Sequence, residues 1–112
     1  MRRLLPLLLL AACSKGPQAD LQYISQARSA AAEWALVNEQ ARLGKLTAHY
    51  VATMRQSLRR EIQSSHSALT APESAYAREM QTLLHEPDDA PPQELRARAA
   101  RLKVIEDGLE SA

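Results

Sequence analysis

The stretch Leu43-Gly44-Lys45-Leu46-Thr47 decides how the chain folds, because it interrupts a long amphipathic pattern. Glycine can take the left-handed conformation that ends a helix without a Cβ penalty, so Gly44 predicts a helix end. Thr47 is a typical N-cap, and Leu46 before it can pack on Val51 as a hydrophobic staple. The stretch therefore predicts a tight turn between two helices, that is, a helical hairpin.

A single long helix from about residue 21 to about 69 is the alternative. The three-four spacing of apolar residues continues past the turn, at Ala48, Val51, Met54, Leu58, Ile62 and Leu69. A glycine inside a helix costs only ~1 kcal/mol. However, a rod without a partner would leave its apolar stripe in water. We therefore favour the hairpin, with helices over about 20–43 and 47–69.

The first helix is expected to begin after Asp20, which can act as its N-cap. Its apolar or small residues fall on one stripe, at Tyr23, Ala27, Ala30, Trp34, Val37 and Ala41. Alanine is the best helix former, and its small side chain lets a neighbouring helix approach closely. We interpret this stripe as core rather than as a docking groove.

A third helix is predicted over about 72–86. Thr70 and Glu73 have the spacing of a capping box, and Pro72 suits the first turn of a helix. The apolar side of this helix would carry Tyr76, Met80, Leu83 and Leu84. The proline-rich segment 87–92 ends it.

A last helix is predicted over about 91–110. It carries apolar residues at heptad spacing, at Leu95, Ala99, Leu102, Ile105 and Leu109. No stretch alternates between apolar and polar residues with period two. The predicted fold is therefore all-α, a helical hairpin extended by two shorter helices, with no sheet, in one small domain over 20–112.

The first 13 residues have the layout of an export signal. Arg2 and Arg3 precede an apolar run from Leu4 to Ala12, which is far shorter than the ~20 residues that a membrane-spanning helix needs. The run ends in Leu10-Ala11-Ala12-Cys13. In this order of charge, apolar run, small residues and cysteine, the chain resembles the bacterial lipoprotein family.

The resemblance implies that residues 1–12 are removed as a signal peptide and that Cys13 becomes the first residue of the mature protein. Cys13 would carry diacylglycerol and an N-acyl chain, and several acyl chains hold a protein permanently at a bilayer. Residues 13–19 would form the lipidated N-terminus and a short tether. Ser14, in place of an aspartate, favours the outer membrane over the inner membrane, with the protein facing the periplasm.

The composition argues against several functional classes. With 14 basic and 13 acidic residues, the chain has no basic excess that would indicate nucleic-acid binding. The resemblance commits the single cysteine to lipid, which leaves no thiol for a disulfide or a metal. The three glycines are widely scattered, so no glycine-rich phosphate loop can form.

The three histidines form no metal-binding or catalytic pattern. His49, His66 and His85 are separated by 17 and 19 residues, which places no two of them on one helical turn. Ser67 follows His66 directly, and adjacent residues point to different sides of a helix. We therefore predict that the protein is not an enzyme and has no metal, no cofactor beyond its lipid and no small-molecule substrate.

One cluster of charge is a candidate binding surface. Arg55, Arg59 and Arg60 lie close together on the expected second helix. They could contact an anionic surface, either lipid headgroups beside the anchor or an acidic partner. The alternative is a solvated face that is balanced by Glu61 and by acidic residues of neighbouring helices.

The number of large apolar residues is modest for a domain of this length. We therefore expect the domain to be only marginally stable alone, and a partner or a second copy would supply further burial. The sequence thus predicts a membrane-anchored lipoprotein that acts as a non-catalytic interaction or structural subunit of the cell envelope. A pilotin-like escort of a secretion-system component is one alternative, by analogy of fold alone. A self-associating coiled-coil lipoprotein is the other.

Overall fold

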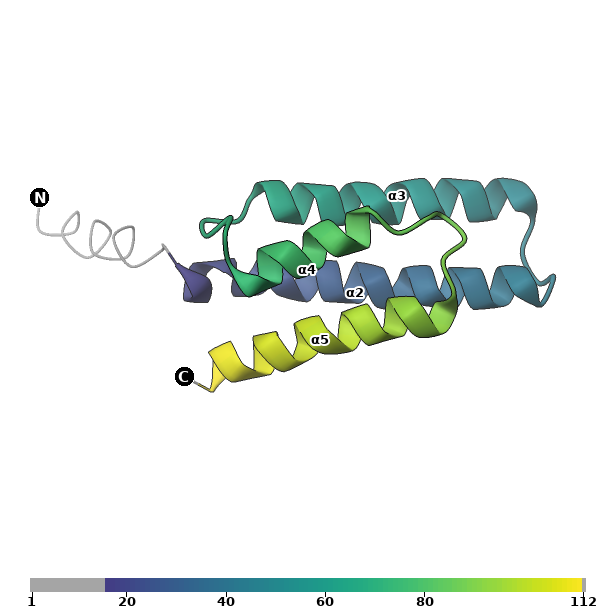
Figure 1. Cartoon of the computed structure of the whole chain (residues 1–112). Coiled ribbons are helices and arrows are strands. Elements are labelled where there is room, and N and C mark those ends of the chain that lie inside the picture. The colour runs from purple at the N-terminus through teal and green to yellow at the C-terminus, as the bar shows by residue number, and fades with distance from the viewer. Residues whose placement is uncertain (1–15, 112) are drawn as a thin grey trace, which may run out of the picture.

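The computed structural model describes residues 16–111, so the predictions for Cys13, Ser14 and the signal peptide lie outside the described residues. The described chain forms four helices and no strand (Figure 1). In chain order they are α2 (Pro17–Arg42), α3 (Ala48–Ser67), α4 (Ala75–Leu84) and α5 (Pro92–Glu110). The predicted all-α fold, a hairpin extended by two further helices, is confirmed.

The turn between α2 and α3 has the geometry that its glycine predicts. Gly44 has a φ of 71° and follows the C-cap of α2. Its N–H donates to the Ala41 carbonyl, and the N–H of Lys45 donates to the Gln40 carbonyl, both at 3.0 Å. This pair of bonds is the Schellman motif that closes helices. The Thr47 hydroxyl then caps α3, which runs back along α2, so the alternative of one long helix is wrong (Figure 1).

Replacing Gly44 with alanine is expected to destabilise the fold by ~1–2 kcal/mol, because an L-residue is strained at a φ of 71°. A Cβ at this position meets no atom within 4 Å, so the cost is conformational strain alone. Gly108 is the matched control, since it lies inside α5 with open space around it. Its change to alanine is expected to stabilise the fold by ~0.5–1 kcal/mol. Urea unfolding of both variants measures the difference, and an equal effect would contradict the turn geometry.

Helix α2 is the centre of the molecule. Helices α3 and α5 pack along it, and the short α4 lies between α3 and α5 (Figure 1). Small residues on α2, such as Ala27, Ala31 and Ala35, are buried and allow these close approaches. The fully buried large apolar side chains come from all four helices: Trp34, Ile24, Ile62, Met80, Leu83, Leu95 and Leu102. One core therefore joins the hairpin to the two further helices.

The start of α2 differs from the prediction. The helix begins at Pro17, directly after its N-cap Gly16. Residues 17–19, which the sequence predicts in the tether, therefore form the first turn of α2. Proline is favourable at the first position of a helix because its φ is already helical and no N–H is lost there. Asp20 is therefore not the N-cap. It lies inside the helix and is completely buried.

The start of α4 also differs from the prediction. Ser74, not Thr70, is the N-cap, and its hydroxyl accepts a hydrogen bond from the Ala77 N–H at 3.2 Å. The predicted capping box of Thr70 and Glu73 does not form, because the Thr70 hydroxyl bonds to Asp20 instead. The helix consequently covers Ala75–Leu84 rather than 72–86.

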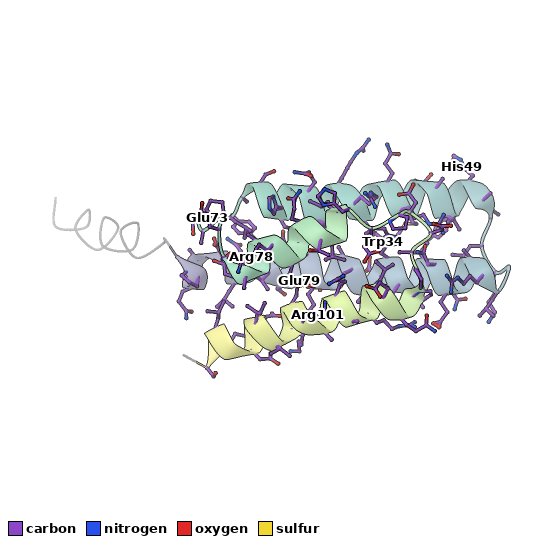
Figure 2. All side chains as sticks on the ribbon, viewed as in Figure 1. Trp34, His49, Glu73, Arg78, Glu79 and Arg101 are labelled. Carbon is purple, nitrogen blue, oxygen red and sulfur yellow. The ribbon has the colours of Figure 1, made fainter. Side chains whose placement is uncertain are left out.

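Ion pairs join α5 to its neighbours. Arg28 of α2 donates to the largely buried Glu106 of α5 at 2.6 Å. Glu79 of α4 lies 3.3 Å from Arg98 and 3.7 Å from Arg101, both on α5. Figure 2 shows Glu79 and Arg101 at this interface. Polar contacts thus hold the last helix where its apolar side meets the core.

Candidate functional site

The structure places the three predicted arginines along one groove. The groove has a volume of about 620 Å³ and runs along α3 beside the end of α4. The residues that α3 contributes are mostly long polar side chains: Ala52, Arg55, Gln56, Arg59, Arg60 and Gln63. Leu84 and Asp88 line it from the other side. The cluster that the sequence singled out is therefore part of a concave surface.

Arg59 is fixed in the wall of this groove. Its Nη1 donates to the Glu86 carbonyl and its Nη2 to the Leu84 carbonyl, both at 2.7 Å. Leu84 is the last residue of α4, and Glu86 follows it by two positions. Carbonyls at a helix end lack partners within the helix, and a positive charge is favourable there. The guanidinium also lies 5.0 Å from the centre of the Trp34 ring, within the range of a cation–π contact. Arg59 therefore has a structural role that the sequence did not reveal.

Side chains of α2 hold the connection between α4 and α5 through hydrogen bonds to its backbone carbonyls. Trp34 Nε1 donates to the Asp88 carbonyl at 2.9 Å, and Asn38 Nδ2 donates to the Asp88 and Ala90 carbonyls at 3.0 and 2.8 Å. The Nε of Arg55 donates in turn to Asn38 Oδ1 at 2.8 Å. Asn38 is buried, and its role was not predicted from the sequence. The signal for it was a polar residue four positions after Trp34, on an otherwise apolar stripe.

Arg60 differs from the other two arginines. Arg55 and Arg59 are half-buried and bonded to the protein, whereas Arg60 is exposed. Within residues 16–111, no hydrogen bond or ion pair of Arg60 is found. The cluster thus combines two fixed guanidinium groups with one that faces solvent.

The histidines lie at separate positions in the bundle. His49 is exposed near the start of α3 (Figure 2), and His66 lies near the end of the same helix. His85 follows α4, and its Nδ1 lies 2.9 Å from the Gln81 carbonyl of that helix. In the described part of the chain, no three His, Cys, Asp or Glu residues gather as they would around a metal ion.

A second polar cluster surrounds Asp20 at the end of the bundle where α2 begins. Asp20 Oδ1 accepts hydrogen bonds from the N–H and the hydroxyl of Thr70, both at 2.9 Å. Oδ2 accepts from the Tyr76 hydroxyl at 2.7 Å and from the Ala71 N–H at 3.2 Å. This buried carboxylate therefore joins the first turn of α2 to the connection between α3 and α4.

Burial and these hydrogen bonds shift the pKa values of Asp20 and Tyr76. Burial alone would raise the pKa of Asp20, but the hydrogen bonds from Tyr76, Thr70 and Ala71 favour the charged form and lower the pKa below its usual 3.8. Burial and the hydrogen bond to Asp20 raise the pKa of Tyr76. Asp20 is thus a charged structural group with all its bonds directed to the protein.

Two further observations bear on the class of protein. Among residues 16–111, none of the helices has the length and apolar character needed to cross a bilayer. No protein-family model matches the chain, and comparisons with curated proteins and with solved structures find no similar protein.

Proposed function

We propose that the chain is a bacterial envelope lipoprotein, anchored by lipid on Cys13, whose helical domain is a non-catalytic interaction or structural subunit. The observation that carries this proposal is the sequence Leu10-Ala11-Ala12-Cys13 behind a charged and apolar segment. The same order of residues would place the domain on the periplasmic side of the envelope, with Ser14 favouring the outer membrane.

The start of the folded domain is compatible with such an anchor. The Gly16 N–H donates to the Thr70 hydroxyl at 3.0 Å, and this hydroxyl lies 3.3 Å from the Gly16 carbonyl. Gly16 follows Cys13 by three positions, and an extended chain over three steps reaches ~10 Å. A lipid on Cys13 would therefore keep this end of the bundle close to the bilayer surface.

The surface of the bundle supports an interaction role. Besides the arginine groove, large apolar side chains are exposed close to the hairpin turn, with Leu36 at 52 %, Leu43 at 60 % and Tyr50 at 48 % exposure. Single exposed apolar side chains are ordinary on a protein surface, so the groove is the better supported candidate contact area.

Metabolic labelling with radioactive palmitate tests the lipid anchor. The parent chain is expected to incorporate the label and to sediment with membranes, whereas Cys13→Ser is expected to lose both properties because serine cannot form the thioether. Ser14→Ala is the matched control, since it changes the next residue and leaves the cysteine in place. An unlabelled parent, or a Cys13→Ser variant that is labelled like the parent, would contradict the proposal.

A further inference from the structure

The groove on α3 carries a surplus of positive charge. Three guanidinium groups line it, and Asp88 is the one carboxylate among its lining residues. Asp88 lies 3.6 Å from Arg59 and is itself mostly exposed, so this contact is a weak surface pair. The remaining charge of the groove is available to an anionic ligand.

Two of the three arginines are positioned before any ligand binds. Arg59 is held by the carbonyls of Leu84 and Glu86, and Arg55 is held by Asn38. Each guanidinium has five N–H donors, so Arg55 and Arg59 keep donors that these bonds do not use. A ligand therefore does not bear the entropic cost of ordering these side chains.

We propose that this groove binds an acidic peptide segment of a partner protein, with peptide carboxylates paired to Arg55 and Arg60. Guanidinium and carboxylate form charge-assisted hydrogen bonds, which are stronger than neutral ones. The amide side chains of Gln56 and Gln63 can bond to peptide groups, and Leu84 offers an apolar contact.

The position of the groove favours a protein over lipid headgroups. Arg59 lies over Trp34, which follows Pro17 by 17 residues. At 1.5 Å per residue, this places Arg59 ~26 Å along α2 from the helix start. The three Cα–Cα steps from Cys13 to Gly16 reach only ~10 Å. A lipid on Cys13 would thus hold the start of α2 at the bilayer, whereas the groove lies along the middle of α3. This inference rests on the interaction role proposed above and specifies the chemistry of the partner.

A binding titration of the full chain in neutral detergent tests the inference. The probe is a fluorescent ten-residue peptide with four glutamates, and the reference peptide has glutamine at those four positions. Arg60→Gln is expected to weaken binding of the acidic peptide at least about fivefold, because it removes an exposed charge of the groove. Arg101→Gln is the matched control, since it removes one exposed arginine from α5, and it is expected to change binding less than about twofold.

Three results would overturn the inference. The acidic and the glutamine peptides could bind alike, which would show that the groove does not recognise carboxylates. The two arginine variants could weaken binding equally, which would indicate only general charge attraction. The third is Arg60-dependent binding of a short-chain, water-soluble phosphatidylglycerol without binding of the peptide, which would assign the groove to lipid. Palmitate labelling of the same preparation shows independently whether the lipid anchor is present. A failure of peptide binding can therefore be distinguished from a failure of the lipid anchor.

Discussion

Replacing Asp20 with asparagine is expected to lower the free energy of unfolding by about 3 kcal/mol. The carboxylate is completely buried and accepts four hydrogen bonds, from Thr70, Ala71 and Tyr76. An asparagine has one acceptor oxygen, and its NH₂ group would face one backbone N–H and one hydroxyl donor at the other position. Urea unfolding of the full chain in detergent, followed by circular dichroism at pH 7, measures the loss.

The stabilisation of the fold by Asp20 should decrease as the pH falls. Because the folded state lowers the pKa of Asp20 below 3.8, its stabilising effect is present above about pH 4 and is lost as the pH falls through the folded pKa. The difference between the parent and the asparagine variant should therefore shrink between pH 7 and pH 3. Asp89→Asn is the matched control on an exposed site and is expected to change stability by less than ~0.5 kcal/mol. A difference that stays constant over this pH range would contradict a charged Asp20.

Replacing Trp34 with alanine is expected to cost about 4 kcal/mol of stability. The ring is completely buried among α2, α3 and the connection that follows α4, so its removal leaves a cavity. The change also removes the hydrogen bond to the Asp88 carbonyl and the ring beneath Arg59. Small domains are stable by ~5–15 kcal/mol, so the variant should be close to its unfolding threshold. Thermal unfolding followed by circular dichroism measures the change.

Trp34→Phe separates the apolar volume from the hydrogen bond. Phenylalanine keeps most of the buried ring and loses the donor to Asp88, so the expected cost is ~1–2 kcal/mol. If the alanine variant loses no more than the phenylalanine variant, the ring does not fill the core as described.

Local sequence signals were sufficient for the fold. Gly44 and Thr47 define the turn because a left-handed residue and an N-cap have narrow sequence preferences. The periodic apolar residues identified the core side of α2, including Ala27 and Trp34, since only one stripe of a helix can face its neighbours. Both features depend on residues within one or two helical turns of each other, so they could be predicted from the local sequence.

Contacts between distant residues were not predictable in the same way. Asp20 and Thr70 each match a capping pattern, yet they bond to each other across 50 residues. The sequence predicts Pro17 in a tether because proline breaks helices, whereas in the structure Pro17 starts α2. A local pattern does not distinguish a polar residue that caps its own helix from one that bonds to another segment.

The candidate groove was also only partly predictable from the sequence. The sequence identified Arg55, Arg59 and Arg60 as a charged cluster, but it contained no signal that the end of α4 would lie beside them. The roles of Arg59 and Asn38 depend on backbone carbonyls, which have no side-chain signature. Their assignment therefore required the arrangement of all four helices.

The mass of the N-terminal tryptic peptide, measured on protein from the membrane fraction, is the most direct test of a lipid-anchored bundle. We expect a peptide that begins at Cys13, ends at Lys15 and carries the mass of diacylglycerol and an N-acyl chain. A peptide with unmodified Cys13, or a chain that retains the segment before it, would show that the bundle is not anchored by lipid on Cys13.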